Sequence, residues 1–201
     1  MIKAITFDLD GVYFINGKEN FLQGLIDLGV KKSDAEKVFF GDKMNKEYKL
    51  GKLTDEEFWN WALKEWKLDL TVEELINLMI KGYEVNKQVE KIVKIVRNNG
   101  YKTLICSNNF PARIKGLQER FGFLDNFDVA VYSHTAGIAK PNKKIFQELV
   151  DKSGVNPNEI VFADDNEEKL SGAKEIGIHA FVYEGFDKYL SELKKLGVKL
   201  S

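Results

Sequence analysis

Five short apolar segments alternate with helical patterns along most of the chain. They are rich in β-branched and aromatic residues, which favours buried strands, and they span residues 2–9, 102–107, 129–133, 159–164 and 179–183. The intervening segments repeat apolar residues with helical spacing and end in glycine, and two of them begin at proline. Strands that alternate with helices predict an α/β fold, a Rossmann-like parallel sheet core with helices on both faces.

Residues 16–85 have a different pattern, with helical periodicity and no convincing strand. Thr54 and Glu57 form one of two capping-box signatures in this stretch. We therefore predict that residues 16–85 form an inserted small α-helical cap. The rest, residues 1–15 and 86–201, would form a discontinuous α/β core.

Composition and charge narrow the class of protein. The chain has 201 residues, of which 44% are hydrophobic, so it can bury one core and a smaller accessory domain. Its 30 basic residues balance 31 acidic ones without long blocks, which gives no electrostatic argument for nucleic acid or a membrane surface as partner. No apolar run suits a signal peptide or a membrane span, so we expect a cytoplasmic protein. A homodimer remains open, and the single cysteine, Cys106, is expected to be an inert strand residue.

Polar residues follow each of the first four predicted strands. Parallel sheets place their binding sites outside the carboxyl ends of the strands, so these residues should converge on one edge. They are Asp8 and Asp10, then Ser107 to Asn109, then Ser133 and His134, then Asp164 and Asp165. Lys140 precedes Pro141, which keeps it extended, and its amine could reach the same crevice. Taken singly, Ser107 could be a helix cap and Lys140 a surface lysine.

Taken together, the four aspartates require a counter-ion, because four carboxylates at one sheet edge repel one another strongly. A hard divalent cation such as Mg²⁺ suits oxygen ligands, and the set lacks the cysteine or histidine expected for zinc. A phosphoryl group would find the cation, Lys140, the Ser107 hydroxyl and the backbone N–H groups that follow it. This combination is typical of phosphoryl transfer.

In their order along the chain, these residues resemble the four motifs of the haloacid dehalogenase superfamily. The motifs are Asp8-Leu9-Asp10-Gly11-Val12, Ser107-Asn108, Lys140-Pro141 and Asp164-Asp165. The predicted cap lies where many members insert a small helical one. The stretch FADDNEEKLSGAKEIG is similar to the fourth motif of the phosphatase branch.

The resemblance implies a role for each motif residue. Asp8 would be the nucleophile and Asp10 the general acid and base. Substrate phosphate would be bound by Gly11, Ser107, Asn108 and Lys140. The metal Mg²⁺ would be held by Asp8, the backbone carbonyl of Asp10, and Asp165, with Asp164 as a further ligand or in the surrounding shell. One departure is Lys169, where many relatives have an acid or an amide, so support for the metal would come from Asn166 or Glu168.

The expected function is therefore that of a Mg²⁺-dependent phosphatase acting on a small phosphorylated metabolite, such as a sugar phosphate or a phosphoglycolate-like compound. A phosphosugar mutase and a haloacid dehalogenase are alternatives of the same fold, and a binding or regulatory module on an inactive scaffold is the non-enzymatic one. The presence of Asp10 with two further acids favours the phosphatase over the dehalogenase. Candidate cap contacts are Lys43, Asn45, Lys46 and Tyr48, which could equally form a solvated face.

Overall fold

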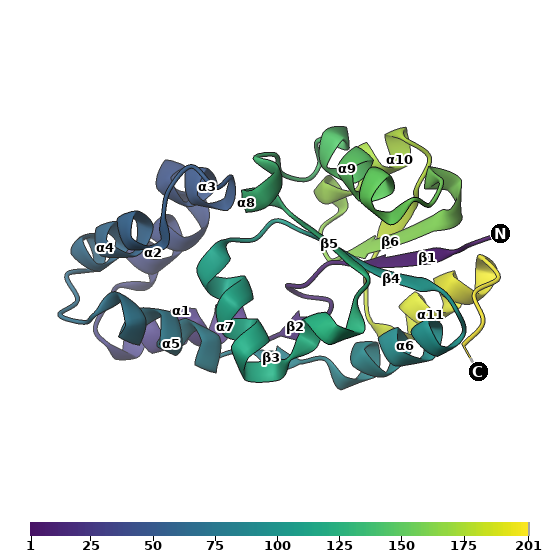
Figure 1. Ribbon diagram of the computed structural model, residues 1–201. Helices are drawn as coiled ribbons and strands as arrows, with labels where there is room; N and C mark the ends of the chain where they lie inside the picture. The colour runs from purple at the N-terminus through teal and green to yellow at the C-terminus, as the bar shows by residue number, and fades with distance from the viewer. Residues whose placement is uncertain (201) are drawn as a thin grey trace.

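The computed structural model describes residues 1–200 and centres on a five-stranded parallel sheet (Figure 1). Its strand order is β5-β4-β1-β6-β7, and all four neighbouring pairs run parallel. The strands are β1 (Ala4–Phe7), β4 (Lys102–Ser107), β5 (Val129–Tyr132), β6 (Ile160–Asp164) and β7 (His179–Val182). They coincide with the five predicted segments, so the α/β prediction is confirmed.

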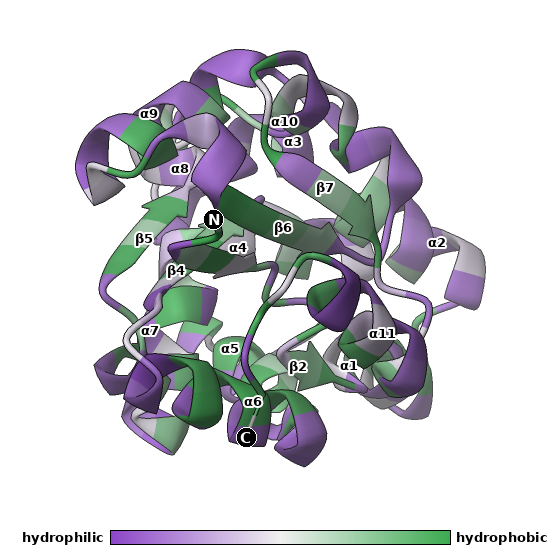
Figure 2. Ribbon diagram, turned by 90° about the vertical axis from the view of Figure 1, so that its right-hand side faces the viewer, coloured by the Kyte–Doolittle hydropathy of each residue, from purple (hydrophilic) through white to green (hydrophobic). Residues whose placement is uncertain are grey.

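Helices cover both faces of this sheet. In Figure 1, α6 (Lys87–Asn98) and α11 (Phe186–Lys195) lie below it, and α9 (Lys143–Ser153) and α10 (Ser171–Glu175) lie above it. Alternate residues of β1 pack on opposite faces of the sheet. Ile5 and Phe7 belong to one apolar cluster, and Ala4 belongs to the other. Figure 2 shows the consequence, with strongly hydrophobic strands enclosed by helices that also carry hydrophilic positions.

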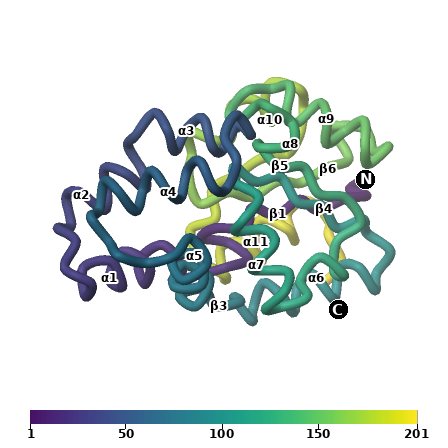
Figure 3. Tube along the Cα trace, turned by 60° about the vertical axis from the view of Figure 1, so that its left-hand side comes forward, coloured from purple at the N-terminus to yellow at the C-terminus, as the bar shows by residue number. Residues whose placement is uncertain are grey.

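Five helices between β1 and α6 form a separate group, which we call the helical unit. They are α1 (Gly17–Asp27), α2 (Lys32–Glu36), α3 (Lys43–Lys49), α4 (Asp55–Trp66) and α5 (Val72–Lys81), with a π-helical turn at Lys37–Gly41. Figures 1 and 3 show this unit beside α7 (Pro111–Phe121), which packs against α5. Thr54 caps α4 reciprocally with Glu57, as the sequence predicts.

Two short strands join the helical unit to the sheet. β2 (Phe14–Ile15) pairs with β3 (Glu84–Val85) in antiparallel orientation, so the two crossings of the chain lie side by side. A side chain at Gly17 would place its Cβ 2.3 Å from the Tyr83 ring, which shows how closely the crossings approach. The sequence did not predict these strands, because two residues are too few to show an alternating pattern.

Aromatic packing fixes the helical unit against the start of α7. Tyr48 stacks on Phe58 at 4.3 Å and on Phe110 at 4.7 Å between ring centroids. Its hydroxyl accepts a hydrogen bond from Trp59 at 3.1 Å and donates one to Asp55. Tyr48 is therefore buried within this packing and is not available as a cap contact to a ligand.

The segment between β6 and β7 is less helical than the helical spacing of its apolar residues predicts. Residues 166–177 form a 3₁₀ turn at Glu167–Lys169 and the short helix α10 (Ser171–Glu175), because the Asn166 side chain caps the turn by accepting from Glu168 N at 2.9 Å. The second short helix in this region of the sheet, α8 (Ser133–Ala136), directly follows β5. Among residues 1–200, no helix has both the length and the apolar character that crossing a bilayer requires.

Candidate active site

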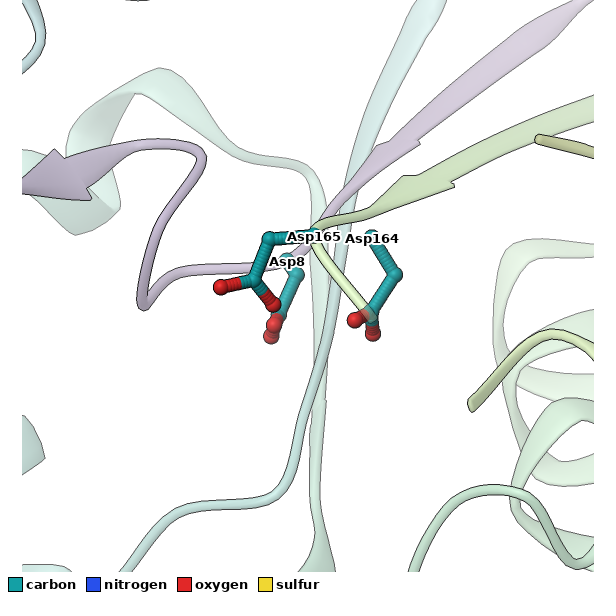
Figure 4. Close-up of side chains that lie close together, drawn as sticks. All are labelled: Asp8, Asp164 and Asp165. Carbon is teal, nitrogen blue, oxygen red and sulfur yellow. The ribbon is translucent and has the colours of Figure 1, made fainter. Parts of the chain in front are cut away.

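Three aspartates meet at the carboxyl ends of β1 and β6. Asp8 follows β1, Asp164 is the last residue of β6, and Asp165 comes next. One carboxylate oxygen from each lies within 4.8 Å of the others, and Figure 4 shows the three carboxyl groups gathered on one side of the strand ends. Asp8 and Asp164 are buried, whereas Asp165 is exposed. The cluster could hold a metal ion.

The charges in this cluster favour binding of a cation. Burial raises the pKa of Asp8, and the negative charges of Asp164 and Asp10 add to that effect against the opposing charge of Lys140. Burial together with the charges of Asp8 and Asp164 raises the pKa of Asp165 to about 6. Burial is the largest cause of both raised pKa values and repulsion between the carboxylates adds to it, so a dication would favour their ionised forms. The donors are all oxygens, which suits Mg²⁺.

Lys140 lies buried behind the cluster and is not a surface lysine. Its Nζ is 3.0 Å from Asp8 Oδ1 and 2.5 Å from Asp164 Oδ2, and it donates to the Cys106 carbonyl at 2.9 Å. Although burial opposes it, the charges of Asp8 and Asp164 raise the pKa of Lys140 well above its ordinary value. The ammonium is thus permanently charged, and it donates hydrogen bonds to the Cys106 carbonyl and to Asp164 while forming an ion pair with Asp8. The Cys106 thiol has a pKa raised to about 12 by burial, so it is inert as predicted.

Asn108 and Ser107 support these groups from the end of β4. The Asn108 side chain accepts from Lys140 N at 2.8 Å and donates to Lys140 O at 3.0 Å, so it fixes the backbone of the lysine. The Ser107 hydroxyl is buried and hydrogen bonded to Asp8, which favours the ionised carboxylate.

Asp10 lies in a different electrostatic environment from the other aspartates. Its Oδ1 accepts a hydrogen bond from the Tyr83 hydroxyl at 2.9 Å, and its Oδ2 lies 2.5 Å from Nη1 of the buried Arg113. Lys18 is 3.9 Å away. Burial alone would raise the pKa of Asp10, but the charges of Arg113 and Lys18, with the Tyr83 hydrogen bond, lower it to about 2.

Sequence reasoning missed Arg113 and Tyr83. The Arg113 guanidinium lies 4.2 Å from the centroid of the Phe110 ring, 5.5 Å from that of Tyr83 and 5.6 Å from that of Phe39. One signal was available, because Arg113 lies four residues before Leu117 on the buried side of α7. A charged residue at such a position requires a buried partner.

The polar end of the third strand does not join the aspartates. Ser133 Oγ donates to the Lys49 carbonyl at 2.6 Å and accepts from Asn109 N at 3.0 Å. His134 Nδ1 lies 2.9 Å from Asn109 O. These residues connect β5, the loop after β4 and α3, so their role is structural.

A cleft of about 530 Å³ opens over the aspartates, between the sheet and the helical unit. The helical unit contributes Lys18, Asn45, Lys46 and Lys49 to its lining, and Lys169 faces it from the sheet side. Of the four candidate cap contacts, Asn45 and Lys46 line the cleft. Lys43 does not, because its side chain is 84% exposed and lies 3.8 Å from Glu47.

Gly11 lets the chain pass directly beside Asp165. Its φ is +81°, and a Cβ at this position would lie 2.1 Å from Asp165 Oδ2. We predict that Gly11→Ala displaces the Asp165 carboxylate and lowers any metal-dependent activity by about 100-fold or more, as expected when a metal ligand or its support is lost. Activity at saturating metal and the midpoint of metal titration measure the effect.

Gly100 offers a matched control for this substitution. Its φ is +83°, but a Cβ there would meet nothing within 4 Å. Gly100→Ala should carry the same backbone strain of about 1–3 kcal/mol and leave metal binding unchanged. Equal losses of activity in both variants would show that backbone strain, and not the collision with Asp165, causes the effect.

Comparison with known proteins identifies the family. The family model of the haloacid dehalogenase-like (HAD-like) hydrolases matches residues 2–177 of this chain. The chain belongs to this family. The D-ribitol-5-phosphate phosphatase of Bacteroides thetaiotaomicron is 26% identical over 206 residues, covering 96% of this chain and 97% of that protein.

Solved structures of family members share the fold. A HAD family enzyme from B. thetaiotaomicron, crystallised in complex with magnesium and inorganic phosphate, is 21% identical, covers 90% of this chain and 94% of its own, and has a TM-score of 0.78. A predicted HAD-like family hydrolase from Porphyromonas gingivalis is 22% identical, covers 99% of both chains and has a TM-score of 0.80. Two other curated relatives are much longer, and this chain spans 13% and 25% of their lengths.

Proposed function

We propose that this family member is a Mg²⁺-dependent phosphatase that hydrolyses a small phosphorylated metabolite through an aspartyl phosphate on Asp8. The observation that carries the proposal is the cluster of Asp8, Asp164 and Asp165 at the floor of the cleft, with their carboxylate oxygens within 4.8 Å of one another. The similarity to a sugar-alcohol phosphate phosphatase over nearly the whole chain supports it.

In the proposed reaction, a carboxylate oxygen of Asp8 attacks phosphorus while the bond from phosphorus to the leaving oxygen breaks. Asp10 gives its proton to that oxygen. Asp10 then takes a proton from a water molecule, whose oxygen attacks phosphorus and releases the Asp8 carboxylate and inorganic phosphate. With its pKa lowered to about 2, Asp10 is ionised before substrate binds, so it must take up a proton as the substrate arrives; after giving that proton to the leaving oxygen it is again the base for the second step. The arriving phosphoryl dianion raises the pKa of Asp10 and so favours its protonation for the first step.

The residues around Asp8 position its carboxylate for attack on phosphorus. Lys140 holds Asp8 and Asp164 in place by ion pairs at 3.0 and 2.5 Å. Asp8, Asp165 and the backbone carbonyl of Asp10 would hold Mg²⁺, with Asp164 beside them. The metal would supply positive charge to the phosphoryl oxygens. The Ser107 hydroxyl and the backbone N–H groups after β4 would bind the remaining phosphate oxygens.

We further propose that residues 16–85, which include the helical unit, act as a cap that closes over the cleft. The cleft is built from both parts, and the crossings meet at Gly17 and Tyr83. Asn16 adopts a left-handed conformation with φ of 65° at the first crossing, as expected for a conformationally special position. Magnesium and phosphate should therefore slow hydrogen exchange at both crossings and in α3. Unchanged exchange in these segments would contradict a closing cap.

The proposed activity is tested by release of inorganic phosphate from p-nitrophenyl phosphate and from a panel of phosphorylated metabolites that includes D-ribitol 5-phosphate. A phosphatase should release phosphate in the presence of Mg²⁺. Release of halide from 2-haloacids, with no release of phosphate, would instead indicate the dehalogenase alternative. That reaction needs no second acid, so it leaves the pairing of Asp10 with Arg113 without a role.

A further inference from the structure

The cleft contains an excess of positive charge that phosphoryl transfer does not use. Besides Lys140, four lysines line it, and they come from both sides: Lys18, Lys46 and Lys49 from the helical unit, and Lys169 from the sheet side. Lys18 lies 3.9 Å from Asp10. Within residues 1–200, Lys46, Lys49 and Lys169 have no carboxylate within 4.0 Å, whereas Lys43 on the same helix pairs with Glu47.

Lys49 has more cations than anions around it, and the charge of Asp10 offsets them only in part. Burial, with the nearby charges of Arg113 and Lys18, lowers the pKa of Lys49 to about 7. Its backbone carbonyl is fixed by Ser133 Oγ at 2.6 Å, so α3 holds this residue in place at the cleft. A partly buried ammonium among other cations is unfavourable unless an anion binds there.

The balance of charges indicates what the anion should be. Five lysines and four aspartates line the cleft, and Arg113 lies directly behind Asp10. A bound Mg²⁺ and the dianionic phosphoryl group of a substrate offset each other, so an excess of positive charge remains on the cap side. A cleft of about 530 Å³, with Phe40 and Leu50 also in its lining, accommodates a short metabolite and not a polymer.

We propose that the substrate carries a second anionic group, a carboxylate or another phosphate, a few carbons from the scissile phosphate, and that Lys49 and Lys46 bind it with help from Lys18 and Lys169. This inference rests on the proposed phosphatase activity and specifies its substrate class.

Matched pairs of substrates test this inference on the wild-type protein. 3-Phosphoglycerate and glycerol 3-phosphate differ by a carboxylate in place of a hydroxymethyl group. Fructose 1,6-bisphosphate and fructose 6-phosphate differ by one phosphate. A charge-assisted contact predicts kcat/KM about tenfold or more higher for the more anionic member of at least one pair. The pair that responds identifies the anion, and equal or lower values for the anionic members of both pairs would overturn the inference.

Substitutions in α3 test whether Lys49 and Lys46 cause the preference for the more anionic substrate. Lys49→Met should lower the ratio of kcat/KM between the more and the less anionic substrate by about tenfold. Lys46→Met should also lower this ratio, which we call the preference for the anionic substrate. Lys43→Met is the matched control, because this lysine lies on the same helix outside the cleft, and the preference should be unchanged. A preference unaffected by Lys49→Met and Lys46→Met, or lowered as much by Lys43→Met, would overturn the assignment. If Lys49→Met does not fold, the Lys46→Met comparison decides.

Hydrolysis of p-nitrophenyl phosphate separates failure of this inference from failure of the proposed function. Hydrolysis of that ester without preference within either pair rejects only the second anion. Absence of hydrolysis of every phosphate ester rejects the phosphatase proposal itself.

Discussion

Asp8→Asn is expected to abolish phosphate release, with kcat lower by about 10⁴-fold or more, as when a catalytic nucleophile is removed. An amide oxygen is a poor nucleophile and cannot form the aspartyl phosphate. The substitution keeps the shape of the side chain and removes one charge from a crowded cluster, so the fold should be retained. Lys140 keeps Asp164 and the Cys106 carbonyl as partners. Steady-state phosphate release and a thermal melt measure the two effects.

Asp151→Asn is the matched control for this variant. Asp151 lies on the exposed face of α9, where it accepts a hydrogen bond from Gln147 at 2.9 Å. The Asp151→Asn variant should have the same activity as the wild-type protein. Turnover by Asp8→Asn above a few per cent of wild type would contradict an Asp8 nucleophile. A binding module would be indicated if the wild type had no turnover and the variant kept an identified partner.

Removal of divalent metal is expected to have the second large effect. EDTA should reduce hydrolysis of p-nitrophenyl phosphate to background, and excess Mg²⁺ should restore it, because Asp8, Asp164 and Asp165 present an oxygen-only site. Mg²⁺ should also raise the melting temperature, since a ligand that binds only the folded state stabilises it. This second measurement does not depend on activity.

Asp165→Asn provides the matched variant for the metal experiment. It removes one carboxylate whose pKa is raised to about 6 by burial and its neighbours. The increase in melting temperature at a fixed Mg²⁺ concentration should become smaller, while Asp151→Asn should keep the wild-type increase. Full hydrolysis in EDTA by wild-type protein would reject the metal site.

The sequence predicted the sheet well, because its strands are nearly continuous apolar runs. All five runs became strands, and the family resemblance carried by the four motifs is confirmed. β2 and β3 were not predictable, since each pairs only two residues and depends on contact between distant crossings. The boundaries of the cap stay a prediction.

The grouping of aspartates at the floor of the candidate site could also be predicted from the sequence. The carboxyl ends of parallel strands lie at one edge, so Asp8, Asp164 and Asp165 had to approach one another. The residues that surround Asp10 could not be predicted in this way. Arg113 and Tyr83 reach it from a helix and from a crossing that are distant in sequence, and only tertiary packing brings them together.

A crystal structure of the protein soaked with Mg²⁺ and beryllium fluoride, a mimic of the phosphoryl group, would show whether Asp8 and a bound metal ion hold the phosphoryl group together. We expect beryllium fluoride attached to an Asp8 carboxylate oxygen and Mg²⁺ about 2.1 Å from oxygens of Asp8 and Asp165. Carboxyl groups that point apart with neither species bound, at concentrations that saturate related sites, would contradict this expectation.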